Sequence, residues 1–157
     1  MMSFSPFDHP FLSGLLGDGE IAGYLSAEAD IRAILSFESA LARAQAGIGV
    51  VPTEAANRIS VECIGLNPNL KQLGAAVARD SVVVPELVRQ LREAVGSSVA
   101  THVHFGATSQ DAIDTSLMLR LQTIVQIFAD RTAEVVEFLH GLERRFGDCL
   151  LMGKTRM

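Results

Sequence analysis

Histidine, hydroxyl, amide and carboxyl side chains gather in one short stretch, His102–Asp111, which reads HVHFGATSQD. The longest helical pattern of the chain follows directly, so this stretch leads into a helix N-terminus. The N–H groups of a first helical turn have no partner within the helix, and the positive end of the helix dipole lies there as well. Both features attract negative charge. The sequence therefore predicts an anion-binding site at this junction.

Each side chain of the stretch has a binding and a structural interpretation. Thr108 and Ser109 can offer hydroxyl groups to an anion, yet Ser109 can equally cap the helix and Thr108 can satisfy a turn. His104 can hydrogen-bond an anion or transfer a proton, or it can hold the loop as a buried residue. His102 shares a face with His104 if the backbone between them is extended. Gln110 can donate a hydrogen bond to an anion.

Composition and periodicity predict an all-α fold. Of the 157 residues, 48% are hydrophobic and 20% are charged, as in a folded globular chain. Helix formers are abundant and alternation of apolar and polar residues is almost absent. Apolar spacing predicts helices over residues 26–47, 54–64, 68–79, 85–95 and 109–146, an irregular apolar arm over 1–20 and a loop over 97–108. The predicted N-cap residues are Ser26, Thr53, Asn67 and Ser109.

The longest predicted helix divides the chain into two domains. Residues 1–108 are predicted to form an N-terminal helical domain with its arm, and residues 109–157 to begin a central long-helix domain. Apolar residues fall on two sides of the long helix, so we expect oligomer partners or further chain to bury it in a bundle. The last residues, Cys149–Met157, are apolar and leave the helix before the sequence stops, which is typical of a truncated chain.

Charge and cysteine usage argue against several kinds of partner. Thirteen Lys and Arg residues against 18 Asp and Glu residues give a net charge of −5, which disfavours nucleic acid as a partner. Cys63 and Cys149 lie in apolar stretches without ligand neighbours, so we predict buried thiols and no metal site. No run of about 18 apolar residues exists to span a membrane, and no basic signal segment opens the chain. We expect a cytoplasmic protein.

Four stretches resemble the fumarase/aspartase superfamily. Thr101–Asp111, with Asp114 and Thr115, resembles its first signature stretch in the form found in adenylosuccinate lyases and 3-carboxy-cis,cis-muconate cycloisomerases. The other three are Ser5–Gly14, similar to the cycloisomerase arm, Phe37–Ala46, similar to the early helix of the superfamily, and Gly153–Met157, similar to the start of the second signature stretch. The resemblance implies the N-terminal helical region and the start of the long central helix bundle of that fold.

Two departures choose between these relatives. The lyases carry a catalytic histidine after the Gly-(Arg/Lys)-Thr of the second signature stretch, and this chain has Arg156 there. The lyases that cleave adenylosuccinate also tend to have a His-Asp pair in the helix before Pro85, where this chain has Arg79 and Asp80. Loss of the second-stretch histidine is typical of bacterial cycloisomerases.

The resemblance therefore implies a cycloisomerase of aromatic-acid breakdown. Such an enzyme adds a carboxylate of 3-carboxy-cis,cis-muconate across a double bond of the same molecule and gives a carboxymuconolactone, without a cofactor. The family implies a homotetramer in which three subunits build each site, and a catalytic serine on a loop downstream of this chain. On this resemblance the chain is an N-terminal fragment, inactive by itself. The alternatives are an adenylosuccinate-lyase-like β-elimination enzyme and a helical assembly module without catalysis.

A tricarboxylate substrate gives the candidate residues their roles. His104 and Ser109 are the expected catalytic residues. The expected substrate-binding residues are His102, Thr108, Ser109, Gln110, Lys154 and Arg156. For Lys154 and Arg156 the structural alternative is a solvated chain end.

Overall fold

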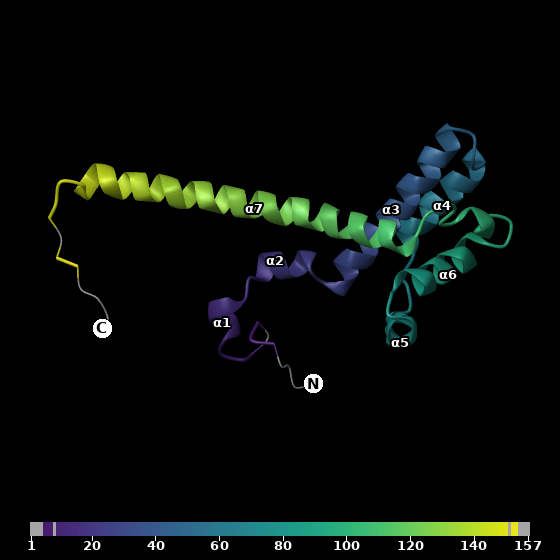
Figure 1. Ribbon diagram of the computed structural model, residues 1–157, viewed down its shortest axis with the longest axis horizontal. Coiled ribbons are helices and arrows are strands. Elements are labelled where there is room, and N and C mark those ends of the chain that lie inside the picture. Colours follow the sequence, from purple (N-terminus) through teal and green to yellow (C-terminus); the bar gives the residue numbers. More distant parts are fainter. Residues whose placement is uncertain (1–4, 8, 151, 154–157) are drawn as a thin grey trace. The chain divides into compact units, whose positions relative to one another are not determined.

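The structure, a computed structural model, describes residues 5–7, 9–150 and 152–153, and within them the secondary structure is helical (Figure 1). The predicted all-α class is therefore confirmed. The helices are α1 (Ser13–Leu16), α2 (Gly19–Tyr24), α3 (Ala27–Gly47), α4 (Thr53–Gly65), α5 (Leu70–Asp80), α6 (Val84–Val95), the 3-10 helix η1 (Ala100–His102) and α7 (Ser109–Phe146).

The chain divides into two compact units, Met1–Leu121 and Gln122–Met157, which part within α7. The first unit holds α1 to η1 and the start of α7, and the second holds the remainder of α7. The predicted domains 1–108 and 109–157 remain a prediction. Among the described residues, no helix combines the length and apolarity needed to cross a membrane.

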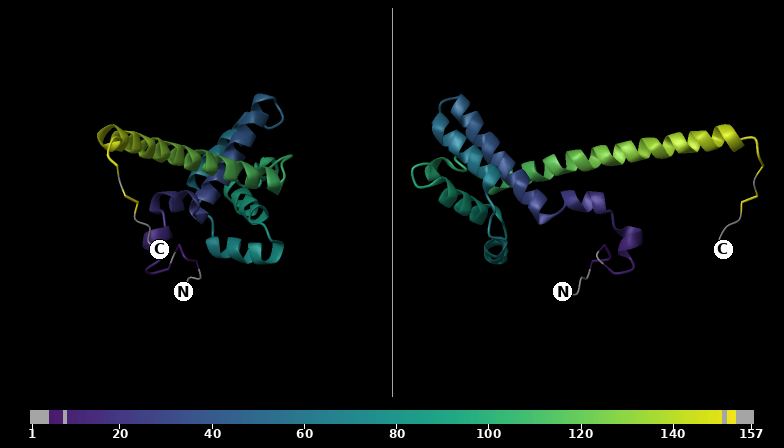
Figure 2. Two further views of the ribbon diagram at one scale, coloured as in Figure 1. Left: turned by 60° about the vertical axis from the view of Figure 1, so that its left-hand side comes forward. Right: turned by 180° about the vertical axis from the view of Figure 1, so that it is seen from behind.

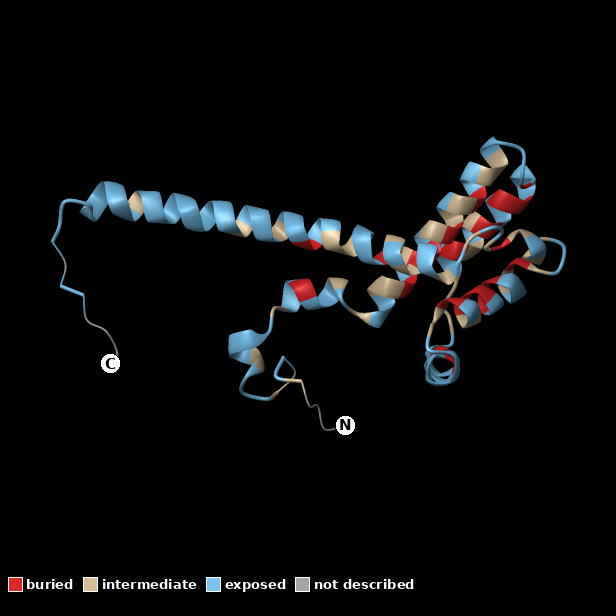
Figure 3. Cartoon of the chain, in the orientation of Figure 1, coloured by how far each residue is buried: buried red, intermediate tan, exposed pale blue. Residues whose placement is uncertain are grey.

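The core of the first unit lies where α3, α4 and α6 meet. Buried residues on α3 recur at Ile31, Ile34, Leu35, Glu38 and Ala42, which is the spacing of one helix face. Figure 3 shows the buried parts of the first unit concentrated on these three helices, and the two views of Figure 2 show α3 and α4 side by side. The other main core residues are Ala55, Ala56, Ile59, Cys63, Val84, Leu87, Val88, Leu91, Val95, Val103 and Ala112.

Local capping explains where α3 begins. Ser26 adopts an extended conformation, and its hydroxyl accepts a hydrogen bond from the N–H of Ala29 at 3.1 Å. Glu28 and Asp30 lie in the first turn, where acids interact favourably with the helix dipole. The predicted N-cap at Ser26 is therefore confirmed. Beyond the end of α3 at Gly47, Gly49 has a φ of 75°, which glycine adopts at little cost.

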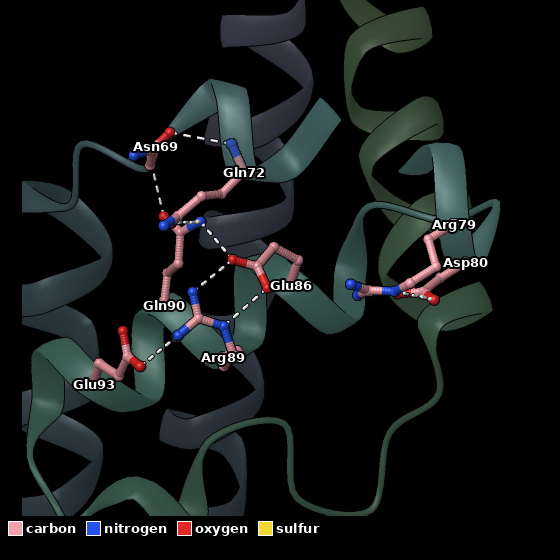
Figure 4. Close-up of polar contacts among 8 residues, drawn as sticks. All are labelled: Asn69, Gln72, Arg79, Asp80, Glu86, Arg89, Gln90 and Glu93. Atoms are coloured by element: carbon pink, nitrogen blue, oxygen red, sulfur yellow. Dashed lines mark hydrogen bonds and ion pairs between the residues drawn. The ribbon is translucent and has the colours of Figure 1, made fainter. Parts of the chain in front are cut away.

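Two predicted helix starts are displaced. Pro52, and not Thr53, is the N-cap of α4, so Thr53 is its first residue. Asn69, and not Asn67, caps α5 through a 3.1 Å hydrogen bond from the N–H of Gln72. The reason lies in α6, since the N–H of Asn69 donates to the side-chain oxygen of Gln90 at 2.7 Å (Figure 4). A tertiary contact thus selects between two equally suitable asparagines.

Glu86 organises the polar face of α6. Its carboxylate accepts hydrogen bonds from Arg89 at 2.6 and 2.8 Å and from Gln90 at 2.9 Å (Figure 4). These bonds, chiefly those from Arg89, lower the pKa of Glu86 to about 2. Because Gln90 also holds Asn69, the network joins the polar face of α6 to the start of α5.

The first turns of α7 are fastened to α3 by Asp30. Its carboxylate accepts hydrogen bonds from the hydroxyl of Ser116 at 2.7 Å and from the guanidinium of Arg120 at 2.8 Å. Arg120 also donates to the backbone carbonyl of Tyr24 at 3.4 Å, at the end of α2. These bonds fix the N-terminal part of α7 against α3.

The N-terminal arm is more helical than predicted. Residues 13–16 form α1, and α2 begins after Asp18, which accepts hydrogen bonds from Glu20 and Ile21 at 3.1 and 3.2 Å. The prediction of an irregular arm is therefore wrong for these residues. A 3-10 turn, η1, likewise interrupts the loop predicted over residues 97–108.

Packing at the core makes Leu91 a sensitive position. Its side chain is fully buried on α6, so Leu91→Ala is expected to lower the free energy of unfolding by about 2–5 kcal/mol through lost burial and a residual cavity. The measurement is urea denaturation followed by circular dichroism. The control is Ile64→Ala, at a position of α4 that is 80% exposed and should change the free energy of unfolding by about 0.5 kcal/mol or less. Equal losses in the two variants would contradict the assignment of the core.

Candidate functional site

Backbone contacts fix the segment 103–108 between η1 and α7. The side chain of Val103 is fully buried, and its carbonyl accepts a hydrogen bond from Arg92 of α6 at 3.0 Å. The carbonyl of Phe105 accepts one from the amide of Gln45 on α3 at 2.7 Å. Gly106 follows with a φ of 70°, a conformation that favours glycine. Two helices of the core therefore hold the segment in place.

His104 lies between these two anchored carbonyls and contacts a buried acid. Its Nδ1 is 2.6 Å from Oε1 of Glu38, and the two side chains are 13% and 1% exposed. The backbone of His104 has a φ of 58°, in the left-handed region that few non-glycine residues adopt. Among the described residues, Nε2 of His104 has no hydrogen-bond partner, so this nitrogen is the one that can interact with a ligand.

Glu38 is a polar member of the core that sequence reasoning did not select. Burial raises the pKa of its carboxyl group, and the charge and hydrogen bond of His104 act in the opposite direction. A signal was present in the sequence, because Glu38 occupies a core position in the periodic stripe of α3. An acid at such a position needs a polar partner, which the sequence does not identify.

Thr108, and not Ser109, caps α7. The hydroxyl of Thr108 accepts a hydrogen bond from the N–H of Asp111 at 3.3 Å, and the carboxylate of Asp111 accepts from the N–H and the hydroxyl of Thr108 at 2.8 and 2.9 Å. This reciprocal pattern is a capping box. The predicted N-cap at Ser109 is therefore wrong, because Asp111 stands three residues after Thr108 and completes the box there.

The capping box changes which groups at the helix start can meet an anion. The bonds from Thr108 lower the pKa of Asp111, with a smaller contribution from the charge of His104. The hydroxyl of Thr108 already contacts this carboxylate. Ser109 is half-buried as a residue, and its hydroxyl has no hydrogen-bond partner among the described residues. Ser109 is thus the hydroxyl that a ligand can reach without displacing Asp111.

Four of the predicted site residues lie on the short path from the anchored segment into α7. His104, Thr108, Ser109 and Gln110 follow one another from the anchored segment into the first turn of α7, where Gln110 donates to Asp114 at 2.6 Å. His102 ends η1 and is half-buried. Lys154 and Arg156 lie outside the described residues.

The possible metal ligands and the two cysteines were also located in the described part of the chain. No group of three or more His, Cys, Asp or Glu side chains there is arranged to hold a metal ion. Cys63 is buried as predicted, and burial raises the pKa of its thiol to about 12, so it remains protonated. Cys149 is exposed beyond the end of α7, so the prediction that it is buried is wrong.

Comparisons with known proteins place this chain in a family. The model of the family described as "Lyase" matches residues 19–157. The 3-carboxy-cis,cis-muconate cycloisomerase of Bradyrhizobium diazoefficiens is 29% identical over 149 residues, which are 93% of this chain and 33% of that protein. The adenylosuccinate lyase of Methanothermobacter thermautotrophicus is 30% identical over 139 residues, 88% of this chain and 31% of that protein.

A solved structure agrees with these matches. The 3-carboxy-cis,cis-muconate lactonizing enzyme of Pseudomonas putida superposes with a TM-score of 0.86 at 28% identity, covering 94% of this chain and 34% of that one. The chain therefore belongs to the lyase family of the fumarase/aspartase superfamily. Within it, the resemblance to the 3-carboxy-cis,cis-muconate cycloisomerases is confirmed, and adenylosuccinate lyases match at similar identity. The chain spans about a third of the length of the curated relatives it matches.

The capping box gives a stability prediction. Thr108→Val removes the hydroxyl and keeps the branched shape, so it is expected to lower the free energy of unfolding by about 0.5–2 kcal/mol at pH 7. Thr123→Val, at an exposed position of the same helix, is the control and should change little.

The same pair of variants gives a pH dependence. Because the pKa of Asp111 is lowered in the folded state, its contribution is complete above the ordinary aspartate value of about 3.9 and is lost as the pH falls through the folded value. The difference between wild type and Thr108→Val, measured by urea denaturation, should therefore be constant from pH 6 to about pH 4.5 and shrink as the pH falls from there to about 3. A difference that stays constant over this range would show that Asp111 does not take part.

Proposed function

We propose that this protein is a 3-carboxy-cis,cis-muconate cycloisomerase of aromatic-acid breakdown and that this chain contributes the start of its active site. The proposal is supported by the helix start, where the hydroxyl of Ser109 has no hydrogen-bond partner in the described part of the chain and follows a segment anchored by α3 and α6. The observation that carries the choice of reaction is Arg156, which stands where the lyases of the superfamily have a catalytic histidine.

The reaction requires charge recognition and one proton. A carboxylate oxygen of the substrate forms a C–O bond, the π electrons of the attacked double bond move to the neighbouring carbon, and that carbon takes up a proton. In this proposal Ser109 and the first N–H groups of α7 hold a carboxylate, with His102, Thr108 and Gln110 beside them. His104 hydrogen-bonds the substrate and can supply a proton, because histidine is the side chain that most often transfers one.

Positive charge is needed beside a tricarboxylate. The described stretch 102–111 contains no Lys or Arg and includes the carboxylate of Asp111. Lys154 and Arg156 are therefore proposed to supply charge from the second signature stretch. No cofactor takes part in this proposal, and the compartment proposed is the cytoplasm.

Self-association completes the proposed enzyme. Large apolar side chains of the second unit are exposed, among them Phe128, Val135, Phe138, Leu139 and Leu142. Buried together, such side chains stabilise helix bundles. We propose a homotetramer whose long helices pack on one another, with each site built from more than one subunit.

Adenylosuccinate cleavage by β-elimination is the second candidate, because adenylosuccinate lyases match at similar identity. In the region where those lyases tend to have a His-Asp pair, Arg79 and Asp80 are exposed at the end of α5 and form an ion pair with each other at 2.7 Å (Figure 4). An arginine held in this way does not supply the neutral proton acceptor that a histidine provides.

Turnover of the protein encoded by the complete reading frame separates the candidates. It would be offered 3-carboxy-cis,cis-muconate and adenylosuccinate in separate assays, each followed by its ultraviolet absorbance. We expect loss of the muconate signal alone. Cleavage of adenylosuccinate alone would overturn the weight given to Arg156, and activity on neither would favour another substrate or a helical assembly module without catalysis.

A substitution at Ser109 tests the carboxylate site. Ser109→Ala in the complete protein is expected to lower kcat/KM for the muconate by about 10- to 100-fold, the usual effect of losing one hydrogen bond to a charged group. Ser97→Ala changes an exposed serine in the turn after α6 and should leave kcat/KM unchanged. A Ser109→Ala enzyme with wild-type kinetics would assign this serine a structural role.

A further inference from the structure

We propose that Glu38 is a positioning residue for His104: the two side chains hold two protons between them, and Nε2 of His104 is thereby kept as an N–H donor for a carboxylate of the substrate. The identity of the carboxylate rests on the function proposed above. The arrangement of protons rests on the geometry of the pair alone.

The pair is built from distant parts of the chain. Glu38 projects from the middle of α3, and His104 belongs to the anchored segment before α7, 66 residues later. Oε1 and Nδ1 are 2.6 Å apart, which is a short hydrogen bond. Oε2 of Glu38 is buried and has no hydrogen-bond partner among the described residues. The carboxyl group therefore has a single polar partner.

Charge balance decides how many protons the pair holds. With one proton, the pair is a neutral imidazole donating from Nδ1 to a carboxylate, which leaves a net negative charge and a partnerless oxygen in the core. A buried charge without an ion pair of its own is strongly unfavourable, and the nearby Arg92 donates its hydrogen bond to the carbonyl of Val103 and not to this carboxylate. With two protons, the pair is either an imidazolium beside a carboxylate or a neutral imidazole beside a carboxylic acid. Both have no net charge, and in both the Nε2 atom carries a proton.

The surrounding groups from each neighbouring helix are consistent with the neutral pair. Arg92 of α6 contributes positive charge near Glu38, and Asp111 of α7 interacts with the charge of His104. Cys63 of α4 stays a neutral thiol, since burial and Glu38 raise its pKa to about 12. Arg92 and Asp111 favour the ionic form of the pair, whereas burial of Glu38 favours the acid form. The proton on Nε2 is common to the two.

The backbone of His104 gives a separate reason to assign a function to this contact. A non-glycine residue in the left-handed region costs conformational free energy, and such residues concentrate at functional sites. The strain is held by the hydrogen bonds from Arg92 and Gln45 to the carbonyls on either side of His104. Glu38 then fixes the orientation of the ring within this backbone.

The protonation state can be measured without reference to turnover. Solid-state ¹⁵N spectra of the histidine-labelled complete protein, with His104→Gln to identify the signals, are expected to show Nε2 of His104 bonded to hydrogen at pH 7. A bare Nε2 nitrogen at this pH would overturn the proposal, whatever the substrate of the enzyme is.

The positioning role is measured by kinetics on the muconate in the complete protein. Glu38→Gln keeps the size of the side chain but cannot carry the charge or exchange the proton. It is expected to raise KM by about tenfold, with a smaller change in kcat, because a ground-state contact is weakened.

Two comparisons separate this role from a loss of folding. Glu54→Gln makes the same chemical change at an exposed position of α4 and should leave KM as in wild type. A Glu38→Gln enzyme whose KM matches wild type, with only the amount of active protein reduced, would overturn the positioning role. If neither assayed substrate is turned over, the proposed function fails and the ¹⁵N measurement still decides the proton assignment.

Discussion

A carboxyl group inside an apolar helix interface is the constraint on which the candidate site depends. Glu38 lies in the same stripe of α3 as Ile34, Leu35 and Ala42, and it is buried as deeply as they are. The interface is stable only if that group receives a polar partner. The partner is His104, so the segment before α7 must return to α3. The contact that allows Glu38 to be buried in the core is thus the same contact that places His104 at the candidate site.

The remaining contacts of the segment follow from that return. Once His104 meets Glu38, the carbonyl of Phe105 lies within reach of Gln45, seven residues further along α3, and Val103 fills the core beside α6. The helix that follows is tied to the opposite part of α3 through Asp30, which holds Ser116 and Arg120. Contacts with α3 therefore hold the start of α7, which carries Ser109, both from the segment before it and from the turns after it.

Much of this arrangement could be predicted from the sequence, and the failures have a common origin. Apolar spacing located the long helix and α3, and the HFGATSQD motif located the candidate site and its family. Those features are local, so a linear pattern records them. Asn69 displaced Asn67 as a cap because Gln90 of another helix binds it.

Glu38 shows the same limit more clearly. Within α3 it reads as one charged residue in an Ala-rich helix, and its significance comes only from a histidine 66 positions away. Thr108 was a different kind of error, since its partner Asp111 is local and the capping-box pattern was available in the sequence. Partners on other helices therefore explain why Asn69 and Glu38 were not predicted, whereas the cap at Thr108 follows from a local pattern.

The separation of Glu38 and His104 along the chain also bears on the order in which the molecule folds. The α3–α4 hairpin is closed by the short connection 48–52, whereas the contact between Glu38 and His104 closes a loop of more than sixty residues that includes α4, α5 and α6. Local contacts form ahead of distant ones because they lose less chain entropy. The strained conformation at His104 is therefore expected to form after the helices have docked. The candidate site would then be completed late in folding.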